Sequence, residues 1–223
     1  MNKRELKDLL YEQVARIGKA VSSPKRLELL ELLAQGEKTV EVLAGELAID
    51  IKLASAHLKA LREARLVQSR REGKYMVYRL SGDDVAGMWV MLRTVAEEHL
   101  VELQLAVQRM VAAPDTLAQV GRADLLEQAR RGEVVVIDVR PAEEFAVAHL
   151  PYARSLPLPE LERRLSELPR DREIVAYCRG PFCLFSDEAQ KLLASQGYRV
   201  RKLLDGVAEW QAAGMPVDRP VVS

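Results

Sequence analysis

Apolar residues recur at helical spacing through most of the first 110 positions of the chain. N-cap residues mark the expected helix starts, with Ser23 ahead of Pro24 and Thr39 ahead of an apolar run. Two shorter runs on either side of Gly73 suit the strands of a hairpin. The pattern predicts helices over residues 6–21, 24–33, 39–47 and 51–64, and strands over residues 67–70 and 75–80.

A longer apolar stripe occupies the next part of the chain. Asp83 and Asp84 suit the first turn of a helix, and apolar side chains then recur at helical spacing as far as Met110. A helix this long cannot bury its stripe inside so small a domain. We therefore expect it to pair with its counterpart in a twofold homodimer, together with the first helix. Residues 112–116 break the pattern, and we place a domain boundary there, between residues 1–113 and residues 114–223.

The second half of the chain alternates between helical segments and short apolar runs. A helix is predicted over residues 123–131, and buried strands over residues 134–139 and 174–178. Ser186 is the predicted N-cap of the helix that follows the second of these strands. This alternation is typical of an α/β domain built on a parallel sheet.

Composition and charge add a limit on the class of protein. The 223 residues carry a formal net charge of zero, so the overall charge gives no indication of a nucleic-acid partner. No apolar run approaches the length of a membrane span, and the charged first residues lack the apolar core of a secretion signal. We expect a cytoplasmic protein with no membrane partner. In that compartment the two cysteines favour redox or sulfur chemistry over a structural disulfide.

Local charge changes this picture between residues 52 and 79. Eight basic residues against two acidic ones give the segment a net charge of +6, which is typical of a phosphate-binding surface. Two short helices joined by a tight turn and followed by a basic hairpin are typical of a helix-turn-helix domain. The plainer alternative is that the basic side chains form an ordinary solvated helix face, as most charged stripes do. The candidate DNA-binding residues are Lys52, Ser55, His57, Lys59, Arg62, Arg70, Arg71 and Lys74.

Residues from about 10 to 110 resemble the winged helix-turn-helix of ArsR-type bacterial repressors, most specifically over residues 55–67 and 71–78. The resemblance implies that the fourth helix contacts the major groove or phosphates of double-stranded operator DNA, and that the hairpin is a wing on the backbone or minor groove. Ile51, Leu53 and Ala56 depart from residues frequent in the family, so we expect sparse base readout. His57 suits a packed spacer at the helix edge equally well.

Metal-sensing relatives of that family use thiolates near the recognition helix, or Asp and His on the last helix. Here residues 39–47 contain no cysteine. His99 has only Glu97, Glu98 and Glu102 nearby, which suits a solvated acidic face better than a metal site. Two thiols in one subunit cannot provide three-thiolate capture of arsenite. We therefore expect no metal and no cofactor.

Cys178 follows an apolar strand and precedes a helix, so its thiol is expected in a tight loop directed at a helix N-terminus. Loop N–H groups and the neighbouring Arg179 would favour a thiolate, and the same loop would hold a terminal persulfide. Gly180 and Pro181 allow the backbone to curl closely ahead of Phe182. The plainer alternative is a buried structural cysteine.

Residues from about 122 to 215 resemble a rhodanese domain, through four motifs in the family's order. The resemblance gives Cys178 the role of the catalytic cysteine, which accepts sulfane sulfur and passes it to an acceptor. Asp138 and Arg140 end a neighbouring strand, so we expect them to brace the loop. Leu184 stands where related phosphatases and arsenate reductases carry arginine, which disfavours phosphate or arsenate chemistry. The four motifs are residues 134–140, 143–151, 178–183 and 204–210.

Cys183 occupies the loop end, where many sulfurtransferases of the family carry Arg or Thr that would meet an anionic donor such as thiosulfate. A thiol there weakens the case for an efficient thiosulfate enzyme. It provides instead a resolving cysteine that can close a bridge with Cys178, while simple apolar packing is an equal alternative.

The predicted fold is therefore a mainly α winged helix-turn-helix domain followed by an α/β rhodanese-like domain. The leading functional hypothesis is a DNA-binding repressor whose rhodanese domain senses a small sulfur donor or oxidant. One alternative is a working sulfurtransferase with an autoregulatory DNA-binding domain. Another is a repressor that responds to a metalloid or to thiol oxidation.

Overall fold

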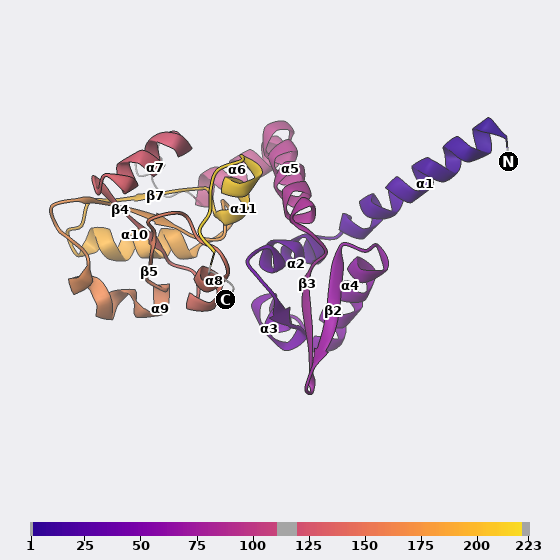
Figure 1. The fold of residues 1–223 in the computed structure, drawn as a ribbon, viewed down its shortest axis with the longest axis horizontal. Coiled ribbons are helices and arrows are strands. Elements are labelled where there is room, and N and C mark those ends of the chain that lie inside the picture. The colour runs from indigo at the N-terminus through magenta and orange to yellow at the C-terminus, as the bar shows by residue number, and fades with distance from the viewer. Residues whose placement is uncertain (1, 111–119, 220–223) are drawn as a thin grey trace. The chain divides into compact units, whose positions relative to one another are not determined.

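The computed structural model describes residues 2–110 and 120–219 (Figure 1). It divides into two compact units, Met1–Trp89 and Val90–Ser223. The division falls inside helix α5 (Asp83–His99), while the boundary predicted at residues 112–116 lies outside the described residues. In the described part of the chain, no helix is both long and apolar enough to cross a membrane.

The first unit places its helices around a small antiparallel sheet of order β1-β3-β2. The hairpin turns at Gly73, whose φ of 59° lies in the left-handed region that glycine adopts readily. The structure confirms the predicted helices and hairpin, and adds a two-residue strand too short to leave a pattern. The elements are α1 (Lys3–Val21), α2 (Pro24–Ala34), β1 (Lys38–Thr39), α3 (Val40–Glu46), α4 (Ile51–Glu63), β2 (Val67–Glu72) and β3 (Tyr75–Leu80).

Local caps fix where the helices of the first unit begin. The Thr39 hydroxyl accepts from the Val42 amide at 3.3 Å, and the Asp50 carboxylate accepts from the Leu53 amide at 2.9 Å. Ser23 lies at the N-cap of α2 as predicted, but its side chain makes no capping hydrogen bond. These caps set α3 and α4 apart as two short helices of a helix-turn-helix.

One face of α4 is anchored in the core of the first unit. Ala54, Leu58 and Leu61 have no exposed surface, and they pack with buried side chains of α2 and α3. Burying each leucine stabilises the unit by about 1.5–3 kcal/mol. Helical spacing then directs Lys52 and Lys59 to the opposite side, where both are exposed.

The prediction of one helix from residue 83 to 110 is wrong, because the chain forms α5 and then α6 (Val101–Met110). The Gln104 side-chain amide donates to the carbonyls of Glu97 and Glu98, at 2.8 and 3.1 Å. A side chain therefore takes the place of backbone amides at the end of α5, and the helix ends at His99. Apolar spacing continues through the break, so the pattern alone does not reveal it.

The second unit is built on a parallel four-stranded sheet of order β5-β4-β6-β7. Alternate side chains enter two cores: Ile137 and Ala176 pack with α10, whereas Val136 and Tyr177 pack with α7 and α11. The predicted α/β fold is confirmed. The elements after α6 are α7 (Arg122–Arg130), β4 (Val134–Asp138), α8 (Ala142–Val147), β5 (Arg154–Ser155), α9 (Leu158–Leu161), the 3-10 helix η2 (Glu162–Glu167), β6 (Glu173–Tyr177), α10 (Phe185–Ser195), β7 (Val200–Lys202) and α11 (Val207–Ala212).

The start of α10 differs from the prediction. Leu184 is the N-cap and Ser186 lies inside the first turn, fully buried, so the predicted N-cap at Ser186 is wrong. The neighbouring Asp187 is also buried, and its carboxylate accepts from the Lys202 ammonium at 2.6 Å. A tertiary ion pair, not a serine cap, therefore fixes this turn.

Candidate functional site

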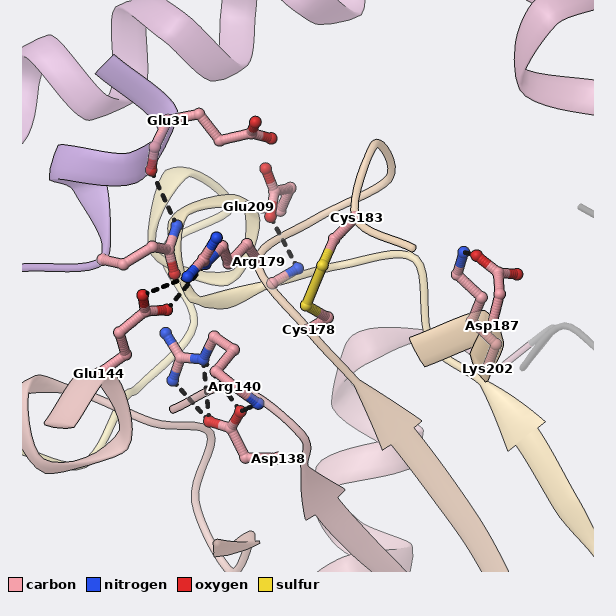
Figure 2. The surroundings of a disulfide bond; sticks show 12 residues. Glu31, Asp138, Arg140, Glu144, Cys178, Arg179, Cys183, Asp187, Lys202 and Glu209 are labelled. Atoms are coloured by element: carbon pink, nitrogen blue, oxygen red, sulfur yellow. Dashed lines mark hydrogen bonds and ion pairs between the residues drawn. A yellow bond between two sulfur atoms is a disulfide. The ribbon is translucent and has the colours of Figure 1, made fainter. Parts of the chain in front are cut away.

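Cys178 and Cys183 form a disulfide in the loop between β6 and α10 (Figure 2). Their Cα atoms are 6.3 Å apart, within the range that a disulfide spans. The Cys183 amide donates to the Gly180 carbonyl at 3.1 Å, which turns the loop back on itself. Cys178 is 1% exposed, whereas Cys183 is only partly buried. The structure thus brings the two predicted thiols together and leaves Cys183 as the more accessible one.

Two glycines let the loop pack closely against the start of α11. Gly180 has a φ of +146°, which residues with side chains rarely adopt. Gly206 packs directly against the backbone of the loop. A Cβ at this position would be 2.5 Å from the Arg179 carbonyl oxygen and 2.7 Å from the Cys178 carbonyl oxygen. The sequence predicts that Gly180 and Pro181 allow the loop backbone to curl closely. It gave no role to Gly206, although this glycine stands within the fourth rhodanese-like motif.

Asp138 and Arg140 form a buried ion pair that contacts Tyr177, the residue before Cys178. The Arg140 guanidinium donates to the Asp138 carboxylate from Nε at 3.0 Å and from Nη2 at 2.5 Å, and neither side chain is more than 1% exposed. The Tyr177 hydroxyl donates to Asp138 at 2.6 Å and accepts from the Leu150 amide at 3.1 Å. Burial raises the pKa of Tyr177 well above its ordinary value, and the Asp138 charge raises it further, so the hydroxyl stays protonated.

Arg179 makes a buried ion pair with a residue that the sequence did not single out. Its Nε and Nη2 atoms donate to the two Glu144 oxygens at 3.0 and 2.7 Å (Figure 2). This bidentate pairing neutralises most of the positive charge that was expected to favour a Cys178 thiolate. Glu144 lies in the second rhodanese-like motif, but its distance of 35 positions from Arg179 hides the pairing.

A second buried pair beside the loop was also missed. Arg93 of α5 donates to Glu209 of α11 at 2.8 Å, and both side chains are 4% exposed. The Lys202–Asp187 and Arg179–Glu144 pairs also lie near the loop. Each of these three cations therefore forms an ion pair with a carboxylate. The loop surroundings therefore offer a dianion such as thiosulfate little unpaired positive charge.

The candidate DNA-binding residues lie on two elements of the first unit. Helix α4 carries Lys52, Ser55, His57, Lys59 and Arg62, and the β2–β3 hairpin carries Arg70, Arg71 and Lys74. All are exposed except Ser55 and His57, which are partly buried. The half-buried position of His57 suits either of the roles proposed for it.

Arg70 differs from the candidate residues Arg71 and Lys74 of the hairpin because its guanidinium is engaged by two carboxylates. It forms ion pairs with Glu37 and with Glu72, the latter at 3.2 Å. The hydrogen bond that Arg70 donates to the Glu37 carboxylate is the main cause that raises the pKa of Arg70. Glu37 lies outside residues 52–79, the segment with a net charge of +6. A phosphate would have to displace these carboxylates, so we expect Arg70 to contribute less to DNA binding than Arg71 or Lys74.

Comparison with known proteins identifies both halves of the chain. Residues 23–69 match the bacterial regulatory protein, arsR family, and residues 122–213 match the rhodanese-like domain. The HTH-type transcriptional regulator Rv0324 of Mycobacterium tuberculosis is 43% identical over 212 residues, which cover 95% of this chain and 93% of that protein. The chain belongs to the ArsR-family transcriptional regulators that carry a rhodanese-like domain.

Other relatives match one half of this ArsR-family regulator. A sulfurtransferase of Allochromatium vinosum is 37% identical over 89 residues, 40% of this chain and 81% of that protein. The solution structure of the homodimeric winged helix-turn-helix domain of Mb0332 from Mycobacterium bovis is 44% identical. It covers 46% of this chain and 93% of that one, with a TM-score of 0.42.

Proposed function

We propose that this ArsR-family regulator is an operator-binding repressor that detects sulfane sulfur, or a related oxidant, at Cys178 and Cys183. The observation that carries the proposal is the pairing of these two cysteines in the loop of a rhodanese-like domain. The rhodanese-like motif supports Cys178 as the receiving thiol, and the pairing with Cys183 places a resolving thiol within bonding distance of it. The modified loop would then change the affinity of the first unit for its operator.

The proposed chemistry needs only a polysulfide as oxidant. The Cys178 thiolate attacks a sulfane sulfur of the polysulfide, which forms a Cys178 persulfide and releases a shorter polysulfide. The Cys183 thiolate then attacks the Cys178 sulfur and expels hydrosulfide. Two cysteines are oxidised to one disulfide, and one sulfane sulfur is reduced to sulfide.

A twofold homodimer is part of the proposal, and α1 supports it. Leu6, Leu10, Tyr11 and Val14 are between 45% and 70% exposed in the single chain. An apolar stripe of this kind is typical of an interface, and a second copy of this chain is the occupant that we propose for it. Such a dimer would present two copies of α4 to a pseudo-palindromic operator.

A working sulfurtransferase is the second candidate function, and the likeness to the Allochromatium vinosum sulfurtransferase favours it. Two features argue against an efficient thiosulfate enzyme. Cys183 stands at the loop end, and the buried cations near the loop are paired with carboxylates. Turnover of thiosulfate and cyanide to thiocyanate would favour this candidate over the sensor.

The test is intact mass spectrometry of the reduced protein after exposure to polysulfide and, separately, thiosulfate, with operator binding followed in the same samples. We expect polysulfide to produce a Cys178–Cys183 bridge, seen as a loss of two hydrogens, together with altered DNA affinity. Cys183→Ser should stop at a persulfide, and Cys178→Ser should form neither product. Sulfur that loads onto Cys178 and turns over while DNA affinity stays constant would exclude the sensor.

Removing two wing cations should lower the salt dependence of operator binding. For Arg71→Ala combined with Lys74→Ala, we expect the slope of log affinity against log salt to fall by about 3.6 for the dimer, because each of its two protomers loses two phosphate contacts and each contact contributes about 0.9. Fluorescence anisotropy over a series of salt concentrations measures this slope. Arg130→Ala, an exposed site on α7 of the second unit, is the matched control and should leave the slope unchanged. An unchanged slope in the wing variant would remove both residues from the DNA interface.

A further inference from the structure

Arg93 holds a buried position that neither DNA binding nor sulfur chemistry explains. It lies in the second half of α5 with its side chain 4% exposed. Its Nη1 donates to Glu209 at 2.8 Å, and its Nε is 3.2 Å from the Glu97 carboxylate. Burial raises the pKa of Glu97, the Glu209 charge raises it further, and Arg93 opposes both. One guanidinium therefore serves two carboxylates that would otherwise repel each other.

The same guanidinium contacts the segment between the two cysteines. It lies 5.6 Å from the centroid of the Phe182 ring, within the range of a cation–π interaction. A Cβ on Gly180 would lie 3.4 Å from Arg93 Nη1 and 3.2 Å from both Glu209 oxygens. The loop between Cys178 and Cys183 therefore has no spare room against this ion pair.

Glu209 extends this contact to the backbone of Cys178. One of its oxygens accepts from the Gly206 amide at 2.7 Å, in the first turn of α11. Gly206 in turn packs on the carbonyl groups of Cys178 and Arg179. A change in the loop at either cysteine thus meets the Arg93–Glu209 pair, through Phe182 and Gly180 on one side and Gly206 on the other.

The helix that carries Arg93 also belongs to the first unit. Val85 and Met88 of α5 pack in the core that supports α4. The helix is continuous from Asp83 to His99, so these two side chains and Arg93 lie on one element. Helices transmit displacement along their length because their backbone hydrogen bonds keep the rise per residue fixed.

We propose that Arg93 is the positioning residue through which the state of the Cys178–Cys183 loop acts on α5, and through α5 on DNA affinity. This inference rests on the proposed sensing function. Closing the bridge fixes Gly180 and Phe182 against the guanidinium, and opening it frees the segment between the two cysteines. The two loop states then interact differently with α5, which is the condition for coupling between two sites.

The deciding variant is Arg93→Gln combined with Glu209→Gln, in the full-length dimer. It removes both charges of the buried Arg93–Glu209 pair together, so that only the partly exposed Glu97 loses its arginine partner, and amide groups can still hydrogen-bond. We expect it to form the same polysulfide-induced bridge as the wild type by mass spectrometry. The ratio of operator Kd values between bridged and reduced protein should be about tenfold or more in the wild type and fall to within about twofold of unity in the variant.

A matched control and a reciprocal measurement complete the test. Lys202→Gln with Asp187→Asn removes another buried ion pair near the loop that does not involve α5, and should keep the wild-type ratio. Thermodynamic linkage requires operator DNA to shift the midpoint potential of the Cys178–Cys183 disulfide in return. The shift should be about 30 mV for each tenfold change in operator Kd that one disulfide causes. The wild type should show this shift and the Arg93 variant should lose it.

The results separate this inference from the proposed function. A wild-type protein whose bridge leaves operator affinity unchanged would overturn both. A wild-type effect that survives in full in the Arg93 and Glu209 double variant would overturn the role of Arg93 alone. Should the double variant fail to fold, Arg93→Lys decides, because it keeps the charge but loses the planar contact with Phe182. A reduced affinity ratio supports the inference, and an unchanged ratio overturns it.

Discussion

Replacing Asp138 with alanine is expected to cost the rhodanese-like unit about 3–5 kcal/mol of stability, the usual cost of removing one partner from a buried ion pair. The Arg140 guanidinium would stay buried without the carboxylate that it contacts at 2.5 and 3.0 Å. The Tyr177 hydroxyl would lose its acceptor at 2.6 Å. Hydrogen exchange followed by mass spectrometry measures the effect as lost protection of amides in β4 and β6.

Glu127→Ala is the control for this prediction. Glu127 also forms ion pairs with arginines, Arg130 and Arg131, but on the exposed surface of α7. Exposed pairs contribute little because water screens them, so the amides of β4 and β6 should keep their protection. Equal protection in the Asp138 and Glu127 variants would show that the Asp138–Arg140 pair does not brace the strand ends.

The same brace connects stability to the cysteine chemistry. Tyr177 immediately precedes Cys178, and its carbonyl accepts from the Val139 amide at 3.1 Å. Loss of Asp138 therefore frees the strand end from which the loop begins. We expect the Asp138 variant to close its Cys178–Cys183 bridge more slowly than the Glu127 control under the same polysulfide treatment.

Elements whose causes are local could be predicted from the sequence. Thr39 and the apolar spacing after it predict α3, and the structure shows the expected cap on Val42. The apolar run of β4 predicts a strand covered on both faces, and its side chains enter two cores. The cysteine loop could be placed because it follows β6 directly and leads to α10.

Features that depend on distant residues could not be predicted. The partner of Arg93 lies 116 positions away and that of Arg179 lies 35 positions away, so no spacing rule connects them. The end of α5 depends on the Gln104 side chain reaching back to two carbonyls, within a stretch whose apolar pattern is uninterrupted. Tertiary geometry decides the two ion pairs, and a side-chain contact within seven residues decides the end of α5; the apolar pattern carries no record of either.

Gly206→Ala is expected to displace the cysteine loop. The backbone of Gly206 has φ of −101° and ψ of −168°, which any residue adopts, so the effect comes from contact alone. The new Cβ would lie 2.5–2.7 Å from backbone atoms of Cys178 and Arg179, and backbone atoms cannot rotate away as a side chain can. Overpacking of this kind costs about 1–3 kcal/mol. We also expect bridge formation to slow by about tenfold, since a small displacement of reacting groups has effects of that order or larger.

Gly121→Ala separates this contact from a general effect of adding a methyl group to the second unit. Among the residues that the structure describes, its Cβ would meet the end of the Asp124 side chain alone, at 3.3 Å, and that carboxylate can move. Urea unfolding and the rate of bridge closure should therefore match the wild type in this control. A Gly206→Ala protein with wild-type stability and closure rate would mean that the loop tolerates displacement toward α11. The close packing of Gly206 on Cys178 would then have no part in positioning the thiol.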